Sequence, residues 1–128
     1  MDRRRLDGLA VFSGLEEQEL DAVAAAATER EFAEGESLMS EGDLGHCLFV
    51  LESGTAQVSS NGSVVGTVGP GDVVGEIAVL ASGRRTASVV ATSPIRSLAW
   101  FKRDVWALED KAPEAAARFR AAIEAHTQ

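Results

Sequence analysis

Residues 75–89 read GEIAVLASGRRTASV, a stretch that places one carboxylate and two arginines close together in an otherwise apolar run. Gly75 lets the backbone come close to a ligand, and a single helical turn after it would direct its first backbone N–H groups at an anion. Arg85 can then hold phosphate oxygens from the other side through charge-assisted hydrogen bonds. The pattern predicts a site for one small anion.

Glu76 is a negative charge beside this expected anion site. An ionised carboxylate only accepts hydrogen bonds, so Glu76 suits a ligand that carries a hydroxyl donor near its own negative charge. A ribose phosphate has both groups, and we expect Glu76 to accept from a sugar hydroxyl while Arg85 and backbone amides hold the phosphate. The alternative is a structural ion pair between Glu76 and Arg85, which stabilises the fold little when it is exposed.

Other phosphate-binding and catalytic motifs do not fit the chain. A P-loop needs a lysine that residues 75–89 lack, and Gly69, Gly71 and Gly75 do not keep the dinucleotide-binding spacing. No nucleophile stands with a base, and no general acid is placed for turnover, so we expect no enzyme and no catalytic residue. His46 has no second ligand at metal-binding spacing, so we expect neither a metal nor a cofactor.

Short strands are expected from about residue 28 to 101, where β-branched or alternating runs are separated by turn signals. Asn61-Gly62 predicts a two-residue hairpin, because both residues tolerate positive φ. Several short strands at this spacing are typical of an antiparallel sandwich or roll, not of βαβ units.

Helices are expected on both sides of the strands. Ser13–Glu16 has the spacing of a capping box and predicts a helix over about 14–27. Pro113 suits the first turn of a helix, within a pair of helices over about 103–126. We expect one mainly β domain over residues 1–128.

Composition and charge narrow the choice of partner. The 128 residues are 45% hydrophobic and 25% charged, which is typical of a folded globular protein. Net charge is −8 and the only lysines are Lys102 and Lys111, which argues against direct nucleic-acid binding. No apolar run reaches membrane-spanning length and no signal peptide is visible, so we expect a cytoplasmic protein. Cys47 is expected to be a core residue, and the Arg3–Arg5 run to be solvated.

The quoted stretch resembles the phosphate-binding cassette of the cyclic-nucleotide-binding domains, through Gly75-Glu76-Ile77-Ala78 and then Arg85-Thr86-Ala87-Ser88-Val89. Upstream, FAEGESLMSEGDLGHCLFVLESGTAQV is similar to the family's paired glycine turns, and VGTVGPGDVVGE resembles the approach to the cassette. The resemblance extends over nearly the whole chain. It implies a jelly-roll-type antiparallel β-roll, with one N-terminal and two C-terminal helices, that binds a 3′,5′-cyclic nucleotide.

The resemblance also implies roles for individual residues. By the family's pattern Glu76 binds the ribose 2′-hydroxyl, Arg85 pairs with the cyclic phosphate, and backbone amides near Ala78 and Thr86 add hydrogen bonds. Ser88 stands where members often carry threonine, and its hydroxyl suits either the phosphate or the base of cAMP or cGMP. The alternative for Thr86 and Ser88 is a strand hydroxyl that bonds to nearby backbone.

Several residues outside this pattern have open roles. Arg84 stands where many members have proline, and it could compete with the phosphate-binding arginine. Phe119 and Ile123 are candidates for an apolar lid over the base, with simple docking on the roll as the alternative. Trp100 and Trp106 are expected to pack in the core, with stacking on a base as the lesser alternative.

We therefore expect a sensor domain that binds cAMP in preference to cGMP and transmits binding by repositioning its C-terminal helices. Its receiver would be an effector protein, or a second copy that pairs through those helices. The chain ends at Gln128 without the helix-turn-helix module of the family's transcription regulators, so either a separate partner or a longer chain is expected. The alternative is a roll that has lost nucleotide binding and serves as an interaction or dimerisation module.

Overall fold

The computed structural model describes residues 3–6, 8–40, 42, 47–75 and 87–126. Its helical elements are the 3-10 turns η1 (Arg3–Leu6) and η2 (Ala10–Phe12) and the α-helices α1 (Glu17–Ala26), α2 (Lys102–Lys111) and α3 (Pro113–His126). Its strands are β1 (Thr28–Phe32), β2 (Ser37–Met39), β3 (Cys47–Ser53), β4 (Ala56–Ser60), β5 (Ser63–Val68), β6 (Val73–Val74), β7 (Ser88–Ala91) and β8 (Ile95–Phe101).

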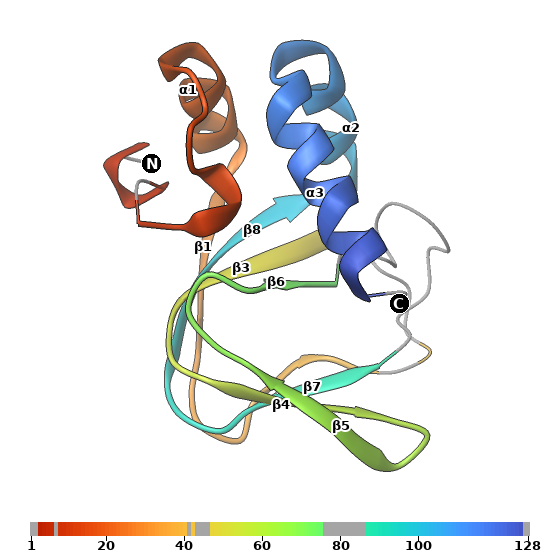
Figure 1. Ribbon diagram of the computed structural model, residues 1–128. Helices are drawn as coiled ribbons and strands as arrows, with labels where there is room; N and C mark the ends of the chain where they lie inside the picture. Colours follow the sequence, from red (N-terminus) through yellow and green to blue (C-terminus); the bar gives the residue numbers. More distant parts are fainter. Residues whose placement is uncertain (1–2, 7, 41, 43–46, 76–86, 127–128) are drawn as a thin grey trace.

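The strands form two antiparallel sheets, each of four strands in the described part of the chain, with the orders β1-β8-β3-β6 and β2-β7-β4-β5. The two sheets face each other as a roll, and the helices gather at one end, against the first sheet (Figure 1). The predicted fold class, an antiparallel β-roll with an N-terminal helix and two C-terminal helices, is confirmed.

Strand β3 separates two hydrophobic cores. Its first five residues are all buried, although successive side chains of a strand point to opposite faces. Leu48 and Val50 pack with the helices, whereas Cys47, Phe49 and Leu51 pack inside the roll. The continuous apolar run therefore reflects a strand covered on both faces, and Cys47 is a core residue as expected.

Three aromatic rings join the helical layer to the roll. The ring centroid of Phe12 lies 5.5 Å from that of Trp100 and 5.8 Å from that of Phe119, and the Trp100 and Phe119 centroids are 5.8 Å apart. The indole Nε1–H of Trp100 donates to the Val23 carbonyl oxygen at 2.9 Å, which satisfies its polar group inside the core. These contacts tie η2, α1 and α3 to strand β8.

The Asn61-Gly62 hairpin forms as predicted between β4 and β5. Ser60 and Ser63 face each other at the end of the ladder, and Asn61 and Gly62 have φ values of 53° and 78°. Positive φ at both central positions is the turn whose twist matches that of the two strands.

The capping box expected at Ser13–Glu16 is not formed. Helix α1 begins at Glu17, and its N-cap Glu16 makes no side-chain cap hydrogen bond among the described residues. Ser13 instead closes η2, since its backbone N–H donates to the Ala10 carbonyl oxygen at 3.1 Å, and Gly14 then turns the chain at a φ of 81°. The neighbouring residue Phe12 is buried in the helical core. This long-range packing affects how the chain enters α1, and the spacing of Ser13 and Glu16 does not contain it.

The expectation of a solvated N-terminal arginine run is wrong for Arg5, whose side chain is 25% exposed. Its Nε–H donates to Glu52 Oε2 at 3.0 Å and its Nη2–H donates to Glu52 Oε1 at 2.5 Å. Arg5 also forms an ion pair with Glu29 of β1. The partners are far away in sequence, so only the folded arrangement brings them together.

Candidate functional site

The predicted ligand-binding residues fall in the connection between β6 and β7. The structure describes Gly75 at its start and Ser88 at its end. The other predicted ligand residues, together with Arg84, lie outside the described residues: Glu76, Ile77, Ala78, Arg85 and Thr86. Their roles remain predictions.

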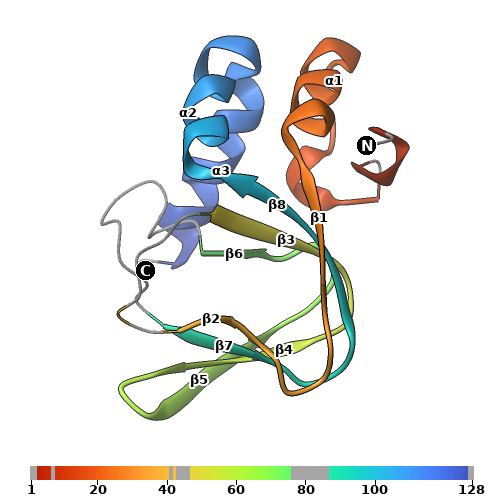
Figure 2. The same cartoon turned by 180° about the vertical axis from the view of Figure 1, so that it is seen from behind.

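The two ends of this connection are held on opposite sheets. Strand β6 pairs with β3 in the sheet that carries the helices, and β7 pairs with β2 and β4 in the other sheet. Both ribbon views show β6 and β7 in different layers (Figures 1 and 2). Residues 76–86 therefore join one wall of the roll to the other.

The start of the connection is positioned by a hydrogen-bonded turn. The Gly71 backbone N–H donates to the Leu51 carbonyl oxygen at 2.7 Å, and the Leu51 N–H donates to the Asp72 carbonyl oxygen at 3.1 Å. The Gly69 N–H donates to Asp72 Oδ2 at 2.8 Å. Gly75 then has a φ of 90°, a conformation that other residues rarely adopt. The turn holds β6 against β3, so the backbone at Gly75 has a defined direction.

Ser88 begins β7, opposite Ser59 of β4, and is half-buried. Its neighbour Val89 is fully buried in the core of the roll. Because strand side chains alternate, Ser88 lies with Val90 on the outward side of β7.

Phe119 lies in the helical core, not over an open site. Its side chain is fully buried against the rings of Phe12 and Trp100. In this arrangement Phe119 cannot cover a base. It matches the alternative interpretation, in which Phe119 only docks the last helix on the roll. The side chain of Ile123 lies outside the described residues.

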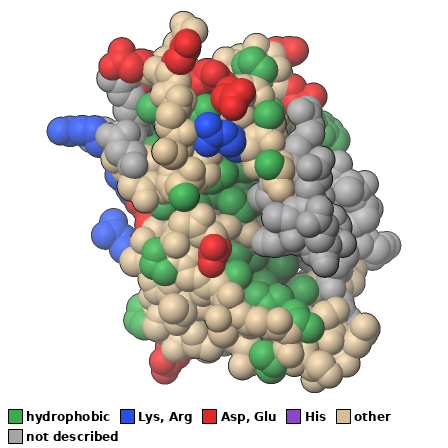
Figure 3. Space-filling view, in the orientation of Figure 1, with side chains coloured by type: hydrophobic (Ala, Val, Ile, Leu, Met, Phe, Trp, Pro, Cys, Tyr) green, Lys and Arg blue, Asp and Glu red, His purple; other side chains and the backbone are tan. Residues whose placement is uncertain are grey.

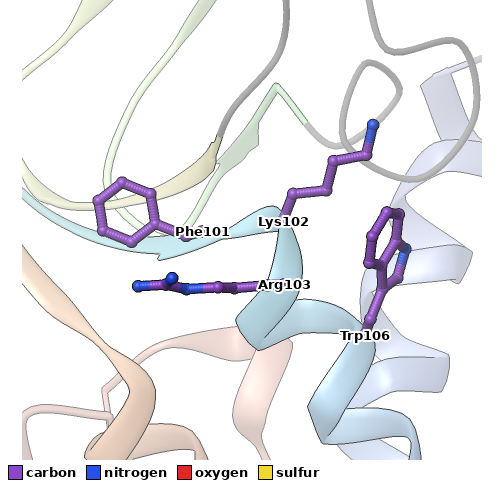
Figure 4. A pocket seen from close by; sticks show the side chains of 4 residues that line it. All are labelled: Phe101, Lys102, Arg103 and Trp106. Atoms are coloured by element: carbon purple, nitrogen blue, oxygen red, sulfur yellow. The ribbon is translucent and has the colours of Figure 1, made fainter.

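The two tryptophans differ. Trp100 is buried as expected, but the expectation of core packing is wrong for Trp106, which is 54% exposed. The Lys102 Nζ atom lies 5.3 Å from the centroid of the Trp106 ring, a cation–π contact. These two residues line a surface pocket of about 310 Å³ together with Phe101 and Arg103 (Figure 4).

That pocket was missed from the sequence, although a signal was present. Phe101, Lys102 and Arg103 are consecutive, and Trp106 follows Lys102 by four residues, so one cation and an aromatic ring share a face at the start of α2. Figure 3 shows acidic side chains gathered over the helical end of the face in view.

Neither a metal site nor a membrane-spanning helix is found among the described residues. No group of three or more His, Cys, Asp or Glu side chains in the described part of the chain is placed to hold a metal ion. No helix among the described residues is long and apolar enough to span a membrane.

Comparison with known proteins agrees with the geometry. The model of the family described as "Cyclic nucleotide-binding domain" matches residues 29–111. Apart from the first residue of β1, this range includes all the described strands and helix α2. The chain is 30% identical over 113 residues to the cyclic AMP receptor protein of Thermus thermophilus, a match that covers 84% of this chain and 52% of that protein. It is 37% identical over 83 residues to a cGMP-dependent protein kinase of Toxoplasma gondii, covering 65% of this chain and 8% of the kinase.

A solved structure extends the likeness to three dimensions. The crystal structure of the Thermus thermophilus catabolite activator protein has a TM-score of 0.81 at 30% identity, with 91% of this chain and 57% of that chain covered. This chain spans about half the length of the bacterial receptor protein and a small part of the kinase. From its matched roll and its glycine-anchored connection, we conclude that the chain belongs to the cyclic nucleotide-binding domain family.

Proposed function

We propose that this chain is a sensor that binds a 3′,5′-cyclic nucleotide at residues 75–88, with cAMP preferred to cGMP. The observation that carries the proposal is the family match over residues 29–111, which contains the whole connection and both strands that hold its ends. Of the two relatives above, the one matched over the larger share of this chain is named for cyclic AMP. The proposed compartment is the cytoplasm.

The same proposal assigns roles within the connection. Arg85 pairs with the cyclic phosphate, Glu76 accepts from the ribose 2′-hydroxyl, and the backbone amides of residues near Ala78 and Thr86 complete the phosphate site. Gly75 supports this assignment. It has a positive φ at the start of the connection, and the lack of a side chain lets a ligand come close to the backbone there.

Signal transmission would follow the strand order. The connection begins at β6, which pairs with β3, and β3 pairs with β8. Strand β8 ends at Phe101 and helix α2 starts at the next residue, so α2 continues directly from the sheet. A nucleotide that binds one placement of α2 and α3 more tightly than another would shift their equilibrium towards that placement. The receiver is an effector protein or a second copy.

Calorimetric titration of the chain with cAMP and with cGMP tests the proposal. We expect micromolar or tighter binding and a preference for cAMP. Arg85→Ala should weaken binding by about 100-fold, because a charge-assisted phosphate contact is lost. The neighbouring Arg84→Ala is the matched control and should bind nearly normally. Equal affinity of the Arg85 variant and the unchanged chain would refute the assignment.

The ribose contact has a separate test. Glu76→Ala should weaken cAMP binding, but it should change the affinity for 2′-deoxy-cAMP much less, because that ligand lacks the hydroxyl donor. Equal losses for both ligands would contradict the role of Glu76.

Two other functions predict different results. The family is one of regulatory nucleotide-binding domains, and we propose that the chain has no catalytic activity, so cAMP incubated with it should stay intact. The alternative is a roll that has lost nucleotide binding, in which Glu76 and Arg85 would pair with each other. It predicts no heat and no ligand-induced rise in melting temperature.

A further inference from the structure

A surface pocket of about 310 Å³ lies at the junction of β8 and α2, away from the predicted nucleotide contacts in sequence. Its described lining consists of Phe101, Lys102, Arg103 and Trp106. Phe101 is 38% exposed and Trp106 is 54% exposed, so two aromatic side chains meet solvent beside two cations. Figure 4 shows Phe101 and Arg103 pointing to one side of the junction, and Lys102 and Trp106 to the other.

Within the described ranges, the two cations of this pocket have no acidic partner. Neither Lys102 nor Arg103 forms an ion pair with a carboxylate among the described residues. Lys102 instead lies over the indole ring of Trp106. In a chain of net charge −8 with two lysines in all, a cationic and aromatic surface is a local exception. Local field and net charge are separate quantities, so this surface attracts anionic groups.

We propose that the pocket docks an acidic peptide segment of a partner protein. The peptide would cross the start of α2, with one carboxylate pairing with Lys102 and another with Arg103 on the other side of the junction (Figure 4). An aromatic or aliphatic side chain of the peptide would pack against Trp106, on the same side as Lys102 (Figure 4). Tryptophan and arginine are the residues most enriched at the energetic centres of protein interfaces, and a carboxylate binds the planar guanidinium with two hydrogen bonds.

Charge argues against other occupants. A second copy that used the same surface symmetrically would bring Lys102 and Arg103 of both copies together, and like charges oppose such a contact. A nucleic acid needs a longer positive surface than this one. Glu109 and Asp110 follow Trp106 by three and four residues and place negative charge on the next turn of the same helix face. A peptide that crosses the start of α2 pairs with Lys102 and Arg103 and does not extend along the helix to these two carboxylates.

The full chain allows a direct test without nucleotide, so the outcome is independent of the proposed sensor function. The chain has two tryptophans, and hence two indole N–H signals in a nitrogen-15 NMR spectrum, which Trp106→Phe would assign. The probe is the blocked octapeptide Ac-EDEFLDEE-NH2. We expect it to shift the Trp106 signal in a saturable manner and to leave that of buried Trp100 in place. No saturable shift at millimolar peptide overturns the proposal.

Matched variants identify the contacts. Lys102→Gln and Lys111→Gln make the same change of charge on the same helix, but only Lys102 lines the pocket. Lys102→Gln should weaken peptide binding about two- to five-fold, as expected for loss of one ion pair at a partly exposed site, and Lys111→Gln should leave it nearly unchanged. A peptide with glutamine and asparagine in place of its carboxylates should bind weakly. Equal effects of the two lysine variants, or equal binding of the neutral peptide, would overturn the proposal. A Trp106 shift that depends on protein concentration would indicate that a second copy occupies the pocket, and it would also overturn the proposal. Tighter binding of single-stranded DNA than of the peptide would do the same.

Discussion

Glu19 of α1 accepts hydrogen bonds from the backbone N–H groups of Glu114, at 2.9 Å, and of the next residue, Ala115, at 3.2 Å. These two N–H groups belong to the first turn of α3, where no partner exists inside the helix. The residue before α3 is Ala112, which has no side-chain oxygen to cap it. A side chain of the N-terminal helix therefore caps the C-terminal helix, and it couples the two ends of the chain.

Replacing this carboxylate should loosen α3. Glu19→Ala is expected to lower the free energy of unfolding by about 1 kcal/mol, the usual effect of removing a helix cap. Urea unfolding followed by circular dichroism measures it. Glu34→Ala, in the exposed turn after β1, removes the same charge without a helix cap and should change stability little. If the two variants were equally stable, Glu19 would not act as a cap.

The Arg5 cluster should anchor the N-terminal segment. Arg5→Gln is expected to lower the free energy of unfolding by about 1 to 2 kcal/mol, because it removes a partly buried two-point contact with Glu52 and the pair with Glu29. The control is Arg96→Gln, whose pair with Glu31 is 3.8 Å long and more than half exposed on both sides. That change should have almost no effect. Similar unfolding midpoints for both variants would mean that the Arg5 contacts contribute nothing.

Gly54 is expected to be intolerant of any side chain. It has a φ of 91°, and a Cβ atom placed there would lie 2.2 Å from the Pro94 carbonyl oxygen. Gly54→Ala should destabilise the roll by about 2 kcal/mol or more, since backbone strain and steric overlap add. Gly66→Ala is the matched control, because a Cβ atom at Gly66 meets no heavy atom within 4 Å and its φ is not positive. Thermal unfolding of both variants would separate the two sites, and equal melting temperatures would be the contrary result.

Phe119 should matter to the fold even without a ligand. Phe119→Ala is expected to destabilise the nucleotide-free chain by about 3 to 5 kcal/mol, because it leaves a cavity between Phe12 and Trp100. Trp106→Ala removes a larger but exposed side chain and should cost less than about 1 kcal/mol. Chemical unfolding of both variants without nucleotide gives the comparison. A Phe119 variant as stable as the unchanged chain would restore the base-lid interpretation.

Some features of this protein could be predicted because they depend on neighbours in the chain. The hairpin at Asn61-Gly62 needs only two residues that tolerate positive φ, and both adopt it. The short strands and their turns follow from alternation and turn chemistry, and the glycine and charge pattern of residues 75–89 indicated the family that the comparisons then established. Local spacing was sufficient in each case, because the physical cause was local.

Other features required the folded chain. The sequence by itself determined the roll, its hairpin and the place of the connection between β6 and β7, because turn geometry and side-chain alternation act over a few residues. The tertiary structure alone decided that Arg5 meets Glu52, that Glu19 caps α3, and that Phe119 is buried while Trp106 is exposed. Each of these depends on which elements pack together. The burial of a side chain, and its contacts with residues far away in the sequence, depend on how the whole core packs. No local pattern in the sequence predicts them.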